Sequence, residues 1–124
     1  TPATFAIYIT GLVFAWLRKQ GGVKAIAEIN QRKANKLYQL IDASEGFYIN
    51  HIDKNCRSRM NVVFNLPNEN LLQLFLKETA ASGLLYLKGH KAVGGIRASL
   101  YNAMPEKGVD TLVDFMSDFM KRNG

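Results

Sequence analysis

Apolar positions recur at helical spacing in the first third of the chain. Residues 5–17 are almost continuously apolar and follow Thr1-Pro2, a pair that suits a helix start because a threonine hydroxyl can cap free amides and proline has a helical φ. We expect a buried core helix from there to about Gln20. Gly21-Gly22 should break it, and apolar residues at i, i+3, i+4 and i+7 predict a second helix over 23–43.

The second half of the chain carries two more helix patterns. The segment 68–70 (Asn-Glu-Asn) can cap a helix over 71–81, which should end at Ser82-Gly83. A last helix should begin at Pro105. Its periodicity is strong, with one apolar face formed by Val109, Leu112, Val113, Met116, Phe119 and Met120.

Short apolar runs between the helices have the character of strands. The clearest is 60–66, which is rich in β-forming residues, and shorter apolar runs occupy 47–49 and 84–87. Residues 98–101 fit a further strand, whereas 88–97 fit no regular element. The order α-α-β-β-α-(β)-β-α predicts an α+β fold, in which a small, mainly antiparallel sheet has helices packed on one face.

Composition narrows the class of protein. The 124 residues are 48% hydrophobic and 21% charged, which suits one globular domain over 1–124. The run 5–17 is shorter than the ~20 residues of a membrane span, it lacks the basic lead-in of a secretion signal, and the single Cys56 can form no intrachain disulfide or zinc site. We therefore expect a cytoplasmic protein with no membrane partner. Because the chain opens on Thr1 rather than Met, we also expect a piece of a longer protein.

The segment 88–99 concentrates polar chemistry. It holds three cations, a histidine and three glycines, and glycine lets a ligand approach the backbone without a Cβ in the way. Its spacing matches neither a phosphate-binding P-loop nor a dinucleotide fingerprint. Two interpretations remain open, an anion-binding loop and a glycine-rich turn with solvated lysines.

Arg97 is the most specific candidate in that segment. Alternation places Arg97, Ser99 and Tyr101 on one face of a strand, opposite the apolar residues between them. A guanidinium held by a strand can grip a carboxylate through two parallel hydrogen bonds, which lysine cannot do. The alternative is a structural ion pair with an acidic residue elsewhere in the chain.

Other charged clusters have simpler interpretations. The acidic row on the last helix (Asp110, Asp114, Asp118) could suggest a metal site, but a solvated charged face explains it, so we expect no metal. Arg57 and Arg59 are interpreted as edge or surface cations, and His51 has no catalytic partner visible in the sequence. The net charge of +6 and the basic stretch 18–36 invite a nucleic-acid interpretation. No aromatic RNA-binding signature accompanies the basic residues, so we expect no nucleic-acid partner.

Several motifs together resemble one enzyme family. They are T-P-A-T-F-A-I-Y at the start, Gly21-Gly22-Val23, R-S-R-M-N-V over 57–62, Gly83-Leu84 and K-G-H-K-A-V-G-G-I-R-A-S-L-Y-N-A-M-P over 88–105. The chain resembles the carboxy-terminal third of the phosphoserine aminotransferases along its whole length. That resemblance implies a fold-type I pyridoxal phosphate enzyme of serine biosynthesis, and in many bacteria also of pyridoxine biosynthesis. It further implies a cytoplasmic homodimer that transfers an amino group from glutamate to 3-phosphohydroxypyruvate.

The resemblance also implies roles for four residues. Arg97 is similar to the arginine that holds the α-carboxylate of the amino or keto acid. His90 and Lys91 correspond to a His-Arg pair that receives the substrate phosphate, with lysine here in place of arginine. Thr1 is similar to a threonine that binds the cofactor phosphate of the neighbouring subunit.

The same resemblance places the catalytic lysine outside this chain. The family's cofactor-binding lysine and the aspartate paired with the pyridine nitrogen both precede the position of Thr1, and no lysine here fits that motif. We therefore expect no catalytic residue in this chain, and no activity or covalently bound cofactor from it alone. The alternative hypothesis is a free-standing, non-catalytic anion-binding or interaction module.

Overall fold

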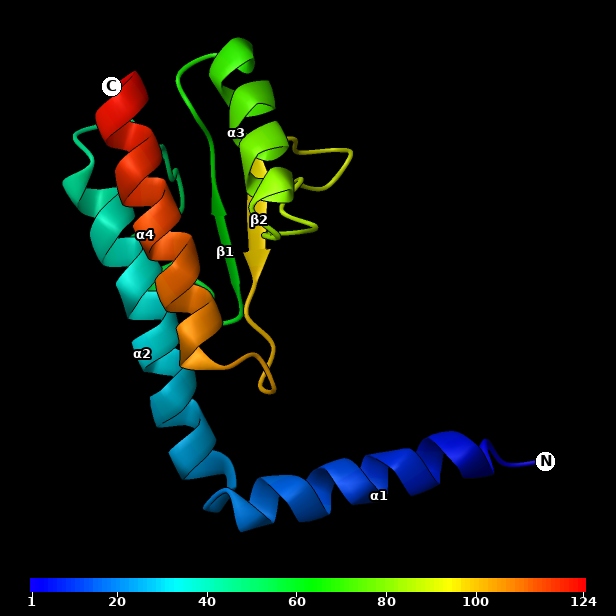
Figure 1. Cartoon of the computed structure of the whole chain (residues 1–124). Coiled ribbons are helices and arrows are strands. Elements are labelled where there is room, and N and C mark those ends of the chain that lie inside the picture. Colours follow the sequence, from blue (N-terminus) through cyan, green and yellow to red (C-terminus); the bar gives the residue numbers. More distant parts are fainter.

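The computed structural model describes all 124 residues, which form four α-helices and two strands. The helices follow the predicted order, with boundaries shifted by a few residues. The third begins at Glu69 because the side chain of Asn68 accepts a hydrogen bond from the Leu71 amide. In chain order the elements are α1 (Thr4–Lys19), α2 (Gly22–Ala43), a 3-10 turn η1 (Lys54–Cys56), β1 (Asn61–Phe64), α3 (Glu69–Ala81), β2 (Ile96–Ser99) and α4 (Glu106–Asn123) (Figure 1).

The sheet is antiparallel, as predicted, but smaller than predicted. It consists of β1 and β2 alone, with Val63 opposite Arg97 and Asn61 opposite Ser99. The apolar runs 47–49 and 84–87 are not strands. Ile49, in the first run, forms only a single bridge with Asn65, and Lys88, next to the second run, forms one with Ile96. β2 also begins two residues earlier than the predicted strand over 98–101.

The core lies between one face of this sheet and the helices α2, α3 and α4. Alternate strand residues, among them Val62 and Ile96, are buried against it. Phe75 of α3 meets Phe64 of β1 and Phe119 of α4 in edge-to-face contacts, with ring centroids 6.0 and 5.1 Å apart. The α+β prediction with helices on one face is therefore confirmed. The opposite sheet face, which carries Arg97, is not covered by a helix of this chain.

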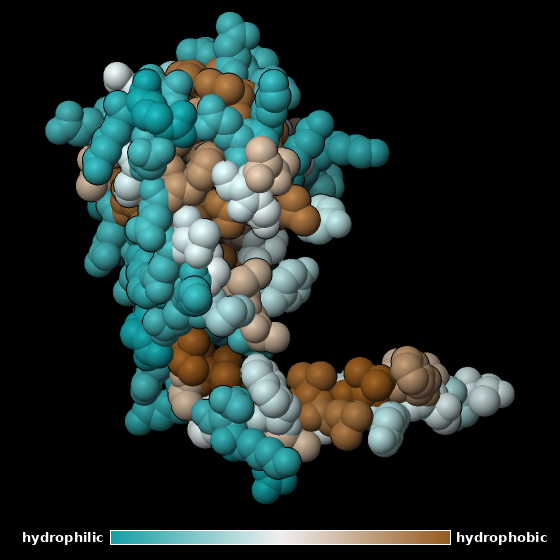
Figure 2. Space-filling model, viewed as in Figure 1, coloured by the Kyte–Doolittle hydropathy of each residue, from teal (hydrophilic) through white to brown (hydrophobic).

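The prediction that the first helix is buried is wrong. α1 contains no buried residue and projects from the body as an arm beyond the Gly21-Gly22 elbow (Figure 1). We call residues 1–19 the α1 arm. Apolar side chains lie along it (Figure 2), including Phe5 at 76% exposure and Phe14 at 60%. No helix of the chain is both long and apolar enough to cross a bilayer.

Thr1-Pro2 also does not cap α1 as predicted. The N-cap residue is Ala3, which has no side-chain acceptor, and the Thr4 amide instead donates to the Pro2 carbonyl oxygen at 2.8 Å. The remaining free amides at this helix end have no side-chain cap. The tip of the arm therefore keeps the donors and the partial positive charge of a helix start.

Candidate anion-binding site

Residues 88–95, which we call the glycine loop, close on themselves before β2. The Gly89 amide donates to the Gly95 carbonyl oxygen at 2.8 Å, and the Gly94 amide donates to the His90 carbonyl oxygen at 2.8 Å. Gly94 and Gly95 have φ of +73° and +65°, which side chains other than hydrogen rarely tolerate. A Cβ on Gly89 would collide with the Gly94 carbonyl. The glycines thus build a turn that delivers the chain into β2.

Arg97 follows directly, on the uncovered face of β2. Its strand neighbours Ile96 and Ala98 are buried at 1% and 2% exposure, so the alternation of faces was predicted correctly. Arg97 forms no salt bridge with any carboxylate of the chain, and its Nε is buried without a hydrogen-bond partner. The structural ion pair that the spacing left open is absent. A buried guanidinium nitrogen without a partner is uncommon and calls for a ligand or a strain to explain it.

A cavity of about 240 Å³ lies between the glycine loop and the loop after residue 48. His51, His90 and Arg97 all line it, so we call it the histidine cavity. No Asp or Glu is among its lining residues. The Nδ1 of His90 accepts a hydrogen bond from the Ala92 amide at 3.2 Å, which leaves its Nε2 available to donate in the neutral ring. The arrangement suits an anion because every ionisable group around it is a cation or an imidazole.

Lys91 does not share this cavity. It is exposed, and it lies outside the set of residues that line the space beside His90. The structure therefore brings together two of the three residues predicted to bind substrate, His90 and Arg97. It adds His51, to which the sequence gave no partner.

A second, larger cavity of about 500 Å³ also has Arg97 among its lining residues. Most of its walls are apolar, including Leu84, Tyr86 and Leu112, and Arg97 is its one charged lining residue. A charge at an apolar wall is screened less by water than a charge on an open surface. Arg97 thus lines both cavities.

Thr1 lies at the far end of the α1 arm, away from β2 and the glycine loop (Figure 1). It is exposed, and no hydrogen bond of its side chain occurs within the chain. Its hydroxyl and the uncapped amides of α1 offer donors to a phosphate. Within this chain, the residue predicted to bind cofactor is separate from those predicted to bind substrate.

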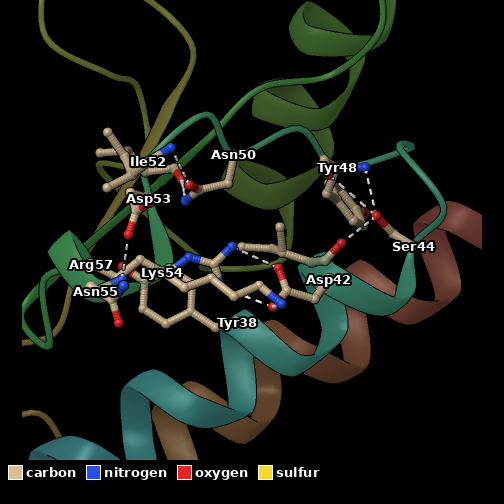
Figure 3. Close-up of polar contacts among 12 residues, drawn as sticks. Tyr38, Asp42, Ser44, Tyr48, Asn50, Ile52, Asp53, Lys54, Asn55 and Arg57 are labelled. Atoms are coloured by element: carbon tan, nitrogen blue, oxygen red, sulfur yellow. Dashed lines mark hydrogen bonds and ion pairs between the residues drawn. The ribbon is translucent and has the colours of Figure 1, made fainter.

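Arg57 is not the surface cation that the sequence suggested. Its side chain is 11% exposed, and its two terminal nitrogens donate to both oxygens of Asp42 at 2.9 and 2.7 Å (Figure 3). The guanidinium also lies over the ring of Tyr38, 4.6 Å from the centroid. The hydrogen bonds from Arg57 lower the pKa of the Asp42 carboxyl below its ordinary value. Arg59, two residues on, is exposed as predicted.

Lys33 belongs to the basic stretch 18–36, yet it does not lie on the surface. It is fully buried, and its Nζ donates to the carbonyl oxygens of Tyr101 and Met104 at 2.8 and 3.1 Å. Burial lowers the pKa of this ammonium group. The missed signal is position, because Lys33 lies on the stripe that contains Ile26, Asn30, Leu37 and Ile41.

Two of the three aspartates in the acidic row of α4 form ion pairs. Asp110 accepts a hydrogen bond from Lys36 of α2, and Asp118 accepts one from Arg122 at 2.9 Å. Asp114 is exposed. No three His, Cys, Asp or Glu side chains of the chain are grouped so that they could hold a metal ion.

Comparison with known proteins identifies relatives along the whole chain. The profile of the family described as Aminotransferase class-V matches residues 1–112. A phosphoserine aminotransferase of Chromobacterium violaceum is 58% identical over 124 residues, and one of Buchnera aphidicola is 60% identical over the same length. Both comparisons cover 100% of this chain and 34% of the relative, so the chain spans about a third of the length of these relatives.

Solved structures agree with the sequence relatives. A phosphoserine aminotransferase from Bacillus circulans subsp. alkalophilus superposes with a TM-score of 0.96 at 41% identity, covering 100% of this chain and 34% of the other. A PLP-bound phosphoserine aminotransferase from Trichomonas vaginalis gives a TM-score of 0.87 at 41% identity, covering 94% and 34%. The first superposition includes the α1 arm, so the arm's direction is shared with that structure.

Proposed function

The chain belongs to the class-V aminotransferases, and from that membership we propose that it is the small carboxy-terminal domain of a phosphoserine aminotransferase. The complete enzyme would transfer an amino group from glutamate to 3-phosphohydroxypyruvate, giving phosphoserine and 2-oxoglutarate. In this proposal it acts in serine biosynthesis, and also in pyridoxine biosynthesis, as a cytoplasmic homodimer. The cofactor-binding large domain lies outside residues 1–124.

Arg97 binds the α-carboxylate of the amino or keto acid in this proposal. Its guanidinium has a buried Nε with no partner and no competing carboxylate, so it is free to form two parallel hydrogen bonds with a carboxylate. The rigid β2 fixes the base of the side chain, which reduces the entropy lost when substrate binds. The unpartnered guanidinium is the observation that carries the proposal.

His90 and Lys91 serve the substrate phosphate. His90 presents its Nε2 from the glycine loop, with the ring held by the bond between Nδ1 and the Ala92 amide. Lys91 is exposed and adds a mobile point charge, whereas an arginine could grip phosphate bidentately. We infer that Lys91 attracts the phosphate electrostatically, whereas His90 fixes the position of the phosphate by a hydrogen bond.

Thr1 and the free amides of α1 fit the phosphate of pyridoxal phosphate, because that end of the helix has no side-chain cap. The cofactor, when bound, supplies the electron sink that amino transfer requires. The chain's own residues bind and orient acid groups, and none of them is assigned a proton-transfer role. Alone, the chain should therefore catalyse no amino transfer.

Substitution of Arg97 in the full-length enzyme tests the proposal. We expect Arg97→Ala to lower kcat/KM for glutamate by about 10²-fold or more, the effect of losing a charged hydrogen-bond pair. Arg97→Lys should recover little of this loss, because an ammonium group cannot bind bidentately. Arg59→Ala, an exposed cation outside both cavities that Arg97 lines, is the matched control. Wild-type kinetics in Arg97→Ala would reject the carboxylate role.

A further inference from the structure

The wall of the histidine cavity that faces the glycine loop carries a second imidazole, that of His51. We propose that His51 is an additional phosphate-binding side chain, which acts with His90 on the phosphate monoester of the keto-acid substrate. This inference rests on the proposed function and adds a specificity-determining residue to it. The two histidines are 39 residues apart in the sequence, so only the fold places them around one space.

The loop that carries His51 is held in place on both sides of that residue. The Asn50 side chain donates to the Val63 carbonyl oxygen of β1 at 2.6 Å and accepts from the Ile52 amide at 2.8 Å (Figure 3). Asp53, the nearest acidic residue in sequence, accepts a hydrogen bond from the Asn55 amide at 2.8 Å. Asp53 does not line the cavity, so its carboxylate is not placed to compete with a bound anion for the imidazole of His51.

His51 itself has no hydrogen bond or ion pair within the chain. It is exposed, so a structural role in the core does not explain its position. Both ring nitrogens of the imidazole therefore remain available, and in the neutral ring one of them is a hydrogen-bond donor. Lys91 lies outside the lining of this cavity, so His51 supplies a donor on a wall where Lys91 offers none.

The charge around the cavity favours a dianion over a neutral ligand. Its ionisable lining residues are His51, His90 and Arg97, with no carboxylate among them. Arg97 is assigned to the substrate carboxylate, so the two imidazoles are left for the second acid group. A three-carbon acid with a carboxylate at one end and a phosphate at the other would meet both kinds of group.

Steady-state kinetics of the full-length holoenzyme test His51. We expect His51→Ala to raise KM for 3-phosphohydroxypyruvate about 5- to 20-fold and to raise KM for glutamate less, because the side-chain carboxylate of glutamate would meet the same imidazoles with less charge than a phosphate. His51→Lys should restore most of the affinity and His51→Asp should weaken it further than alanine does. Inorganic phosphate, used as a competitive inhibitor, should show the same order of inhibition constants.

Three results would overturn the assignment of His51. The first is an unchanged KM in His51→Ala while wild-type enzyme and Arg59→Ala are both active. The second is an equal rise in KM for both substrates with no rescue by lysine, which indicates a structural role. The third is weaker binding of pyridoxal phosphate with normal KM values, which would assign His51 to the cofactor phosphate. If instead the wild-type enzyme transfers no amino group, the proposed function itself fails.

Discussion

Three cationic side chains, those of Arg57, Lys33 and Arg97, are partly or fully buried. They differ in their hydrogen-bond partners. Arg57 pairs with both oxygens of Asp42, and Lys33 donates to two backbone carbonyl oxygens. Arg97 has no carboxylate partner and keeps a buried, unpaired Nε. The Nε of Arg57 is buried without an acceptor too, but its two terminal nitrogens are bound by Asp42. The Arg97 guanidinium has no acceptor within the chain at any of its nitrogens, and for that reason we assign the ligand-binding role to Arg97.

Lys33 gives a prediction about stability. Lys33→Met keeps an apolar stem but leaves the carbonyl oxygens of Tyr101 and Met104 without their donor, so we expect the free energy of unfolding to fall by about 1–3 kcal/mol. Urea denaturation of the chain measures this change. Lys24→Met, an exposed lysine on the same helix, is the control and should change stability little. Equal stability of the two variants would show that the buried bonds contribute nothing.

The Arg57 and Asp42 pair gives a prediction about pH. The pKa of Asp42 is lower in the folded chain than its ordinary value of 3.8, so folding favours the ionised carboxylate. Its stabilisation is complete above the unfolded pKa and is lost as pH falls through the lowered folded value. We expect Asp42→Asn to reduce the dependence of unfolding free energy on pH below about 4. An identical acid profile in wild type and Asp42→Asn would contradict the pair's contribution.

At the scale of elements, helices were easier to predict than strands. All four expected helices are present, because a long apolar pattern repeats its signal many times. The strands are four residues each, and neither of the apolar runs 47–49 and 84–87 forms a strand, although Ile49 makes a single bridge with Asn65. A short apolar run therefore shows neither that all its residues are buried, since Leu85 and Tyr86 are 56% and 93% exposed, nor whether its amides pair with a neighbouring strand.

The glycine loop gives a prediction at the same scale. Gly89→Ala forces a methyl group into the Gly94 carbonyl, so we expect a lower melting temperature and a raised KM for the phosphorylated substrate in the full-length enzyme. Gly11→Ala, where a Cβ meets nothing within 4 Å in mid-helix, is the control for the melting temperature of the isolated chain. It should leave that temperature unchanged or raise it slightly, because alanine favours helix. A Gly89→Ala enzyme with wild-type melting temperature and KM would contradict the tight loop.

At the scale of the whole molecule, the α1 arm is the element whose side chains this chain leaves unburied. Its hydrophobic pattern correctly indicated a helix, but the pattern cannot say which polypeptide covers it. No other part of this chain buries the side chains of the arm, and yet the arm has the same direction in a solved relative about three times as long. We infer that the arm packs against the remaining two thirds of the complete enzyme, which would bury side chains such as Phe5 and Phe14.

The uncovered arm predicts self-association of the isolated chain. Many apolar side chains of the arm, among them Phe5 and Phe14, are exposed to water, so we expect light scattering to report dimers or larger species. Phe5→Ser combined with Phe14→Glu should shift the chain towards the monomer. Val23→Ser, an exposed apolar residue at 83% exposure beyond the elbow, is the control and should not. A wild-type chain that stays monomeric at high concentration would contradict self-association through the arm.

A crystal structure of the full-length enzyme with glutamate bound tests the central claim most directly. We predict that two nitrogens of the Arg97 guanidinium lie about 2.7–2.9 Å from the two oxygens of one glutamate carboxylate. The residue would then have the partner that its Nε lacks in this chain. A structure in which Arg97 turns to solvent, or pairs with an Asp or Glu of the protein while glutamate binds elsewhere, would contradict the account.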